Sequence, residues 1–209
     1  DDTFCAVPVG ANAKSFVWYS PSAFEESGYT VPTTWDEMMT LTAKIESEKG
    51  GDGLTKPWCA GIESGGATGW PATDWLEDLM LRTGTPEDYD AWVAHEIPFN
   101  DPKVVAALDQ AGTILRDDKY VNGGLGDVNS IATTAFGDAG LPILDGTCYM
   151  MRQASFYQAN WTEGTTVAED GDVYAFYLPG TTAETKPLLV GGEFAASFAD
   201  RPEVQAFLA

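Results

Sequence analysis

The sequence predicts an α/β fold in which a mixed or parallel β-sheet is flanked by helices. Strand-like runs alternate with helical patterns through most of the chain, which is typical of this class. Of the 209 residues, 44% are hydrophobic and 12% are aromatic, so the chain has enough apolar material for a well-packed core. No internal repeat or low-complexity linker interrupts the sequence. We therefore expect residues 1–209 to form a single compact domain.

The first expected elements are two strands and a short helix. Residues 4–9 (FCAVPV) and 15–20 (SFVWYS) have the apolar and aromatic composition of strands. Between them, the small residues of GANAK (10–14) permit a sharp change of direction. Residues 20–28 (SPSAFEESG) then predict a short helix that ends at a glycine.

A stronger helical pattern lies within residues 31–51. Thr34 is placed to cap this helix, and Glu37 stands at the reciprocal position of a capping box. Apolar residues recur at helical spacing and predict one buried face, formed by Trp35, Met38, Leu41 and Ile45. After a glycine-rich loop, residues 57–63 (PWCAGIE) are predicted to form a short buried strand.

The stretch SGGATGWPATDW (64–75) leads into a further helix. We expect Thr73 to cap this helix, Trp75 to lie on its apolar stripe in the core, and Gly84 to mark its end. Trp70 then falls in the preceding loop, where two roles are open. It either packs as a hydrophobic staple on the helix that it introduces, or it offers an aromatic surface to a ligand.

The rest of the chain continues the alternation. A short helix is expected around residues 89–96, and another begins at Asp101 and Pro102, a capping residue followed by a first-turn proline. The expected buried face of that helix is Val104, Val105, Leu108, Ala111 and Leu115. The remaining expected elements are a helix over 129–136, strands over 148–153, 173–179 and 187–198, and a helix from Pro202. The chain enters a strand-like run at once and breaks off in a helical pattern, so we expect a piece of a longer protein.

The charge balance argues against nucleic-acid binding and against attachment to an anionic membrane surface by charge. Eleven basic and 32 acidic residues give a net charge of −21. Binding to nucleic acid depends on Lys and Arg that neutralise phosphates, and attachment to an anionic membrane depends on the same charges. The acidic residues are spread along the chain, which is typical of a solubilising surface.

The cysteine pattern leaves one question open. Cys59 and Cys148 each lie in a strand-like run, so they either form a disulfide across a sheet or remain two separate buried thiols. A disulfide would indicate an oxidising compartment. No cysteine pair has CxxC spacing and the chain has a single histidine, so no metal site is expected.

The sequence lacks residues that several kinds of binding and catalysis require. The glycine run at 64–69 has neither the lysine nor the order of a phosphate-binding loop, so no nucleotide cofactor is expected. His95 lies far in sequence from any nucleophile elbow and is predicted to lie at a helix end or in solvent. Paired carboxylates such as Asp74 and Asp78 leave a glycosidase open by residue type, but that chemistry needs two carboxylates held across a cleft.

Aromatic residues point instead to carbohydrate. The chain has seven tryptophans, eight tyrosines and ten phenylalanines. The C–H faces of sugars stack on aromatic rings, and their hydroxyls need carboxylates, amides and backbone donors nearby. A few exposed aromatics beside polar groups would therefore form a sugar site.

Four segments together carry a resemblance to a known family. They are VPVGANAKSFVWYSPSAFEESGYTVPTTWDEMMTLTAKI (7–45), GIESGGATGWPATDWLEDLMLRTG (61–84), GTCYMMRQASF (146–156) and LPGTTAETKPLLVGGEFAASFADRPEVQAFL (178–208). In this order they resemble the extracellular solute-binding proteins, family 1, of carbohydrate ABC importers, and in particular the α-glucoside-binding branch that is similar to maltose-binding protein. The resemblance implies a lobe of the type II periplasmic-binding-protein fold. It implies that residues 1–209 are the C-terminal lobe of a bilobed protein.

The resemblance also implies ligand-binding positions in this chain. The polar contact of the hinge strand falls at Asn12, where relatives often carry an acid. The loop that supplies an aromatic and a polar group falls at Trp70, with Thr73 and Asp74 nearby. The aromatic platform corresponds to Phe156, where many relatives have tryptophan. The remaining implied positions are Gln153, Gly191, Gly192 and Glu193.

The function implied by the resemblance is non-catalytic binding of an oligosaccharide for ABC-transporter uptake. The expected partners are the sugar and the permease subunits, and the expected state is a monomer outside the cytoplasmic membrane, as a periplasmic or lipid-anchored protein. A Cys59–Cys148 disulfide would fit that location and leave Cys5 unpaired. The alternative function is that of a glycoside hydrolase fragment acting on α-glucosides, which turnover of an aryl glucoside would reveal.

Overall fold

A four-stranded mixed sheet forms the centre of the protein. The computed structural model describes residues 6–122 and 125–208. The strands are β2 (Phe16–Tyr19), β3 (Lys56–Trp58), β4 (Cys148–Arg152) and β5 (Tyr174–Tyr177). Their order is β3-β4-β2-β5, with β3 parallel to β4 and the other pairs antiparallel. The predicted α/β class with a mixed sheet is confirmed.

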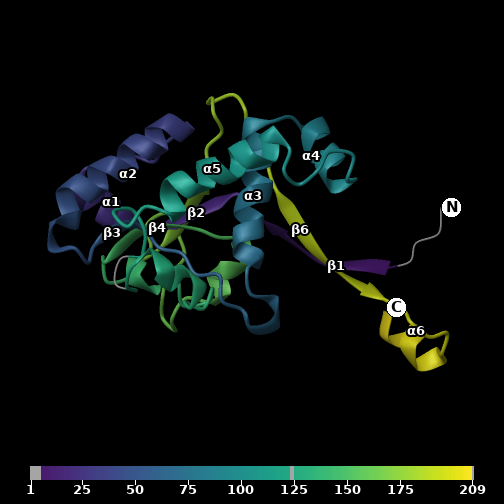
Figure 1. Cartoon of the computed structure of the whole chain (residues 1–209). Coiled ribbons are helices and arrows are strands. Elements are labelled where there is room, and N and C mark those ends of the chain that lie inside the picture. The colour runs from purple at the N-terminus through teal and green to yellow at the C-terminus, as the bar shows by residue number, and fades with distance from the viewer. Residues whose placement is uncertain (1–5, 123–124, 209) are drawn as a thin grey trace.

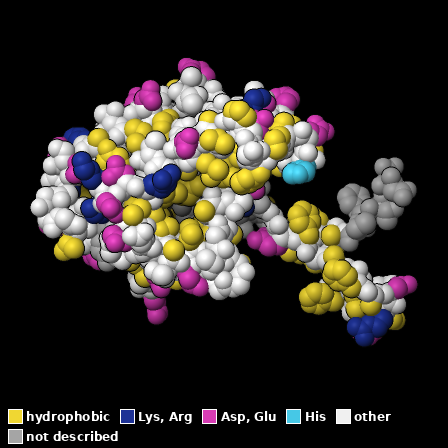
Figure 2. Space-filling model, in the orientation of Figure 1, with side chains coloured by type: hydrophobic (Ala, Val, Ile, Leu, Met, Phe, Trp, Pro, Cys, Tyr) yellow, Lys and Arg dark blue, Asp and Glu magenta, His cyan; other side chains and the backbone are white. Residues whose placement is uncertain are grey.

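A two-stranded ribbon leaves this body. Strands β1 (Ala6–Ala13) and β6 (Val190–Ala196) pair antiparallel, and the ribbon extends away from the sheet with helix α6 (Pro202–Leu208) at its far end (Figure 1). Hydrophobic side chains gather along the projecting ribbon (Figure 2). The predicted turn over residues 10–14 is wrong, because Gly10–Ala13 continue β1 opposite Val190–Glu193. The partner strand lies about 180 residues away in sequence and supplies the hydrogen bonds of this strand. The prediction considered only the small neighbouring residues, which carry no information about that partner. The start of the first predicted strand, and Cys5, lie outside the described residues.

Five further α-helices belong to the body. They are α1 (Pro21–Ser27), α2 (Trp35–Lys49), α3 (Trp70–Thr83), α4 (Pro86–Val93) and α5 (Pro102–Leu115). Short 3-10 helices are η1 (Gly50–Asp52), η2 (Gly65–Ala67), η3 (Val128–Ala132), η4 (Leu141–Ile143) and η5 (Ser155–Ala159).

Caps fix the starts of several helices. The Thr34 hydroxyl caps α2 by accepting from the Glu37 N–H at 3.2 Å, as predicted. The Glu37 carboxylate accepts from the N–H and hydroxyl of Thr33, one residue earlier than a capping box requires. A full capping box instead begins α4, between Thr85 and Asp88. That helix starts at Pro86, three residues before the predicted range.

Apolar side chains cover both faces of the sheet. Strand β2 alternates, with Val17 and Tyr19 in one cluster and Trp18 in the other. The first cluster contains buried faces of α2, α3 and α5, whereas the second contains residues near η4 and η5. Strand β4 is buried along its whole length between these layers.

Three further sequence predictions need correction. On α5 the buried residues are Val104, Ala107, Ala111 and Ile114, whereas Val105 and Leu108 are 42% and 43% exposed. This helix is apolar over more than half its circumference, so the pattern did not define one face. The predicted helix over 129–136 is only the 3-10 turn η3, and the strand predicted over 57–63 ends at Trp58. The Asp127 side chain caps the start of η3 by accepting from the Asn129 N–H.

A disulfide joins two neighbouring strands. Cys148 opens β4 and Cys59 directly follows β3, and their sulfurs are bonded with a Cα–Cα distance of 5.8 Å. The parallel pairing of Lys56 with Cys148 and of Trp58 with Met150 brings the two cysteines together. Of the two alternatives left open by the sequence, the disulfide is therefore the one that forms.

No helix of the described chain is long and apolar enough to cross a membrane.

Candidate functional site

A hollow of about 310 Å³ lies where the ribbon joins the body. Its lining comes from three separate parts of the chain: the ribbon, the start of α3 and the segment after β4. The lining residues are Asn12, Lys14, Trp70, Ala154, Phe156, Gly191, Gly192 and Glu193. Six of them are positions that the family resemblance implied, so the tertiary structure brings most of the expected site together.

Three aromatic rings meet beside this hollow. Trp70 contacts Phe136 with ring centroids 5.1 Å apart and Phe156 at 5.8 Å, and the two phenylalanines are 6.1 Å apart. All three side chains are half-buried, so they pack on one another while keeping exposed surface. Phe136 is missing from the sequence-based site. Phe136 precedes a glycine in a segment that was predicted as helix, and this context gave no signal for a binding role.

The start of α3 differs from its prediction. The helix begins at Trp70 after Gly69, whose φ of 107° favours glycine, and no side chain caps it. Thr73 is therefore not the cap; it lies exposed within the first turns and does not line the hollow. Pro71 in the first turn explains the earlier start, because its fixed φ and missing N–H suit that position. Trp70 contacts rings from other segments, and Trp75 is buried in the core as predicted.

The ribbon supplies the polar side of the hollow. The Asn12 amide donates to the Glu193 carboxylate at 3.2 Å, and the Ser155 hydroxyl donates to Asn12 Oδ1 at 3.4 Å. Asn12 is paired with Gly191 across the ribbon, and Gly10 with Glu193. The strand register therefore holds an amide and a carboxylate on the side of the ribbon that faces the aromatic rings.

Two glycines of β6 keep this region open. A Cβ on Gly192 would lie 2.9 Å from the backbone oxygen of Gly10, which has little freedom to move. A Cβ on Gly191 would lie 2.6 Å from Cε of Lys14 and would displace that side chain. Their small size maintains both the strand approach and the depth of the hollow.

Two of the predicted site residues are buried away from the hollow. Asp74 is 3% exposed and Gln153 is 2% exposed, and neither belongs to the lining. The Gln153 side chain accepts from the Ala154 N–H, so it stabilises the turn that places Phe156. Asp74 instead pairs with Lys14 and with Arg152.

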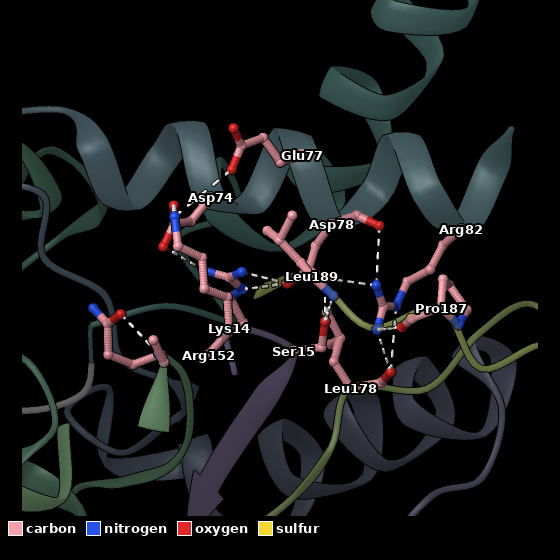
Figure 3. Close-up of polar contacts among 12 residues, drawn as sticks. Lys14, Ser15, Asp74, Glu77, Asp78, Arg82, Arg152, Leu178, Pro187 and Leu189 are labelled. Atoms are coloured by element: carbon pink, nitrogen blue, oxygen red, sulfur yellow. Dashed lines mark hydrogen bonds and ion pairs between the residues drawn. The ribbon is translucent and has the colours of Figure 1, made fainter. Parts of the chain in front are cut away.

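A buried ionic network lies beneath the hollow (Figure 3). Lys14 Nζ bonds to Asp74 Oδ1 at 2.7 Å and lies 3.9 Å from Glu77. Behind it, Asp78 accepts from Arg82 Nη1 at 2.7 Å and from Arg152 Nε at 3.0 Å. Arg152 Nη1 also lies 3.5 Å from Asp74. Three cations thus meet three carboxylates on one side of α3.

The network also holds the junction between β1 and β2. The Ser15 hydroxyl donates to Asp78 at 2.6 Å and accepts from the Leu189 N–H at 2.9 Å. Arg82 donates to the backbone oxygens of Leu178 and Pro179. The chain that enters the ribbon and the chain that returns from it are therefore both anchored to α3.

Burial shifts two pKa values in this network. The pKa of Glu77 is raised by desolvation, despite the opposing attraction of Lys14. The pKa of Arg82 is lowered by its burial, an effect that the attraction of Asp78 opposes. Arg82 nevertheless remains charged near neutral pH, since a guanidinium stays protonated in proteins.

Sequence reasoning missed this network, although a signal was present. Asp74, Asp78 and Arg82 recur at intervals of four on the same helix as the core residues Trp75 and Leu79. Charged residues at that spacing lie along one side of a helix, so a buried ionic stripe was predictable in principle. Their partners, Lys14 and Arg152, come from other elements and carry no such local signal.

Other features of the described chain offer less to a ligand. No group of three His, Cys, Asp or Glu among the described residues is arranged to hold a metal ion. A hollow of about 440 Å³ between the end of α1 and α2 is lined by Tyr29, Asp36 and Lys44, with no comparable aromatic group of several rings. His95 is exposed just beyond α4, as expected.

The α/β body, its projecting ribbon and the aromatic platform of Trp70, Phe136 and Phe156 are the features of a solute-binding protein, and comparison with known proteins supports this class. Residues 1–208 match the family model for the bacterial extracellular solute-binding protein. The chain belongs to this family.

Two curated relatives have high identity. The chain is 45% identical to the alpha-glucosides-binding periplasmic protein AglE of Rhizobium meliloti (strain 1021), over 97% of this chain and 43% of that protein. It is 43% identical to the osmoprotective compounds-binding protein GgtB of Synechocystis sp., over 100% of this chain and 48% of that protein. The chain thus spans about half the length of the curated relatives that it matches.

Solved structures share the fold at lower identity. A chitin oligosaccharide binding protein matches with a TM-score of 0.73 and 19% identity, over 98% of this chain and 48% of the other. The bacterial solute receptor AcbH, described as preferring b-D-galactopyranose, has a TM-score of 0.69 and 23% identity, over 92% and 44%. The expected lobe of a periplasmic-binding-protein fold is confirmed.

Proposed function

We propose that this chain is the C-terminal lobe of a bilobed solute-binding protein, and that it binds an α-glucoside or a related oligosaccharide for uptake by an ABC importer. The observation that carries the proposal is the hollow itself. It sets two half-buried aromatic rings, Trp70 and Phe156, opposite the Asn12–Glu193 pair. A sugar needs this combination of a flat apolar surface and directional polar groups.

The names of the two relatives support the substrate class. AglE is named for α-glucosides and GgtB for osmoprotective compounds. Both matches cover essentially all of this chain, so they include every residue of the hollow.

The proposed role is binding without catalysis. Glycoside hydrolysis needs two carboxyl groups across the scissile bond, separated by roughly 5 to 9.5 Å. Among the described residues that line the hollow, Glu193 is the one carboxylate. Asp74, Asp78 and Glu77 lie beneath it and are engaged with Lys14, Arg82 and Arg152. This arrangement favours binding over the hydrolase alternative.

We further propose a monomer outside the cytoplasmic membrane, whose partners are the permease subunits of the importer. The Cys59–Cys148 disulfide supports an oxidising location. In the intact protein, closure of the second lobe over the hollow would supply the other half of the sugar contacts.

Fluorescence titration of the intact protein tests this function. Addition of maltose, trehalose or raffinose should change the tryptophan emission, because Trp70 lines the hollow. The ligand should also stabilise the protein, by about 2.7 kcal/mol at a hundredfold excess over Kd. A flat response across these sugars in both emission and melting temperature would refute the proposal. Release of glucose from maltose, or of nitrophenol from an aryl glucoside, would instead support the hydrolase.

A further inference from the structure

Lys14 lies at the edge of the hollow, and its ammonium is bonded to the buried carboxylate of Asp74. It follows the last residue of β1, and its side chain is 25% exposed. Its Nζ donates to Asp74 Oδ1 at 2.7 Å, and Glu77 lies at 3.9 Å. Figure 3 shows the Lys14 side chain reaching up to these two carboxylates on α3. The ammonium therefore has a buried partner in Asp74, and its position at the edge of the hollow leaves it accessible to a ligand.

Two further contacts fix the position of Lys14. Its backbone N–H donates to the Leu189 oxygen at 2.8 Å, which joins it to the strand returning from the body. Its Cε occupies the space that a side chain on Gly191 would fill. The lysine is therefore placed by its backbone, by the adjacent glycine and by the carboxylate behind it.

The donor capacity of this ammonium is only partly used. A lysine has three N–H donors, and Asp74 takes one of them. Glu77 is within ion-pair distance but beyond a hydrogen bond. Asn12 and Glu193, the other polar side chains of the lining, bond to each other.

The charges around the hollow are nearly balanced. Lys14, Arg82 and Arg152 meet Asp74, Glu77 and Asp78 in the network. Glu193 adds a further carboxylate on the lining. Among the described lining residues Lys14 carries the one positive charge, and carboxylates outnumber cations here by one. The site therefore offers a strong donor without a net attraction for anions.

We propose that Lys14 donates a hydrogen bond to a hydroxyl of the ligand, and that Asp74 and Glu77 neutralise it so that the site selects neutral sugars over anionic ones such as sugar phosphates. Asp74 is then a positioning residue that holds the Lys14 ammonium, whereas Glu77, which lies beyond hydrogen-bond distance, contributes only its charge. This inference rests on the proposed function and adds a contact residue and a charge preference to it.

Calorimetry on the intact protein, with matched neutral and anionic ligands, tests the inference. The ligand pairs are trehalose with trehalose 6-phosphate, and maltose with maltose 1-phosphate. The wild type should bind the neutral member of a pair at least tenfold more tightly. Lys14→Met should weaken neutral binding by about 10- to 100-fold, which is the range for a hydrogen bond to a charged group. Lys49→Met, at an exposed lysine in the last turn of α2, is the matched control and should bind as wild type does.

A second variant tests the charge balance without removing the donor. Glu77→Gln replaces a carboxylate that is 24% exposed, so the fold should tolerate it. Its affinity for the neutral sugar should stay within about twofold, while the phosphate ester should bind roughly 3- to 10-fold more tightly, as expected for one fewer negative charge near the surface.

The outcomes separate the two proposals. If the wild type binds sugar and a folded Lys14→Met protein binds it equally well, the Lys14 contact is wrong while the proposed function stands. The charge preference is wrong if the wild type prefers the phosphate ester, or if Glu77→Gln leaves phosphate binding unchanged. If the wild type binds neither member of either pair, both this inference and the proposed function fail.

Discussion

Arg152 of β4 donates from Nε to Asp78 Oδ2 of α3 at 3.0 Å, and neither side chain has exposed surface. Asp78 also accepts from Arg82 and from the Ser15 hydroxyl, so one carboxylate joins the central sheet, the helix and the root of the ribbon. Loss of this carboxylate would leave the buried guanidinium groups of Arg82 and Arg152 without the partner that they share.

Asp78→Asn should lower the free energy of unfolding by about 3 to 5 kcal/mol, because it leaves two buried arginines without their shared partner. Urea unfolding followed by circular dichroism measures the change. Glu203→Gln is the matched control, since its pair with Arg201 is about two-thirds exposed. An exposed pair contributes about 0 to 1 kcal/mol, so the control should differ little from wild type. Equal stabilities for both variants would show that the network does not hold the lobe together.

Loss of the disulfide should also destabilise the protein. Cys59 and Cys148 are 89 residues apart, and the double change to alanine releases that loop in the unfolded chain. Loop-closure entropy predicts a loss of about 4 to 5 kcal/mol for a loop of this size. Unfolding of wild type with and without reductant provides the same comparison without mutation. No shift in the urea midpoint on reduction would contradict this prediction.

The aromatic platform should contribute to ligand affinity. Trp70→Ala and Phe156→Ala each remove a ring from the hollow, and binding of the sugar by the intact protein should weaken by roughly 30-fold or more, as for aromatic residues at binding hot spots. Trp92→Ala is the control, because Trp92 packs on Tyr89 and Phe99 around α4, away from the hollow. If Trp70→Ala and Phe156→Ala both bind like the control, the site lies elsewhere.

Tyr157 should contribute to the loss of stability in alkali. Burial raises its pKa to about 12, and its hydroxyl donates to the Gly137 oxygen at 2.7 Å and accepts from the Gly140 N–H at 2.9 Å. Between about pH 10, the usual tyrosine pKa, and pH 12, the unfolded chain has lost this proton and the folded chain retains it. The unfolded state binds fewer protons, so this contribution to stability is complete below pH 10 and is lost as the pH rises to 12.

Tyr157→Phe should therefore show a shallower fall in unfolding free energy between pH 10 and 12 than wild type. At pH 7 it should be less stable by about 1 to 3 kcal/mol, because the buried Gly140 N–H and the part-buried Gly137 oxygen lose their partner. Tyr174→Phe, on the exposed side of β5, controls for the change of side chain at pH 7. An alkaline slope identical to that of wild type would contradict the role of Tyr157.

Local patterns predicted much of the fold. The α2 face of Trp35, Met38, Leu41 and Ile45 is buried, and Thr34 caps that helix. These features depend on residues within one or two turns of each other, so a sequence contains them directly. The α5 face was misassigned for the same reason, because its pattern is apolar on too many sides for local spacing to select one.

The candidate site could be predicted in part, through family resemblance. Asn12, Trp70, Phe156 and the Gly191–Glu193 segment of β6 do line one hollow. Thr73 and Asp74 were assigned by proximity in sequence to Trp70, but Thr73 is exposed outside the lining and Asp74 is buried against Lys14. Lys14 and Phe136 entered only with the tertiary structure, which placed them beside residues that are distant in the chain.

By itself, the sequence determined the α/β class, most of the helices and strands, the likeness to a family and the residue types of a sugar site. These follow from short-range periodicity, caps and ordered motifs. The tertiary structure decided that Cys59 and Cys148 are bonded, that β1 continues to Ala13 opposite β6, and that Asp74 faces Lys14 beneath the hollow. Each of those outcomes depends on contacts between residues about 60 to 180 positions apart, whose free energy is gained only when the chain has closed on itself.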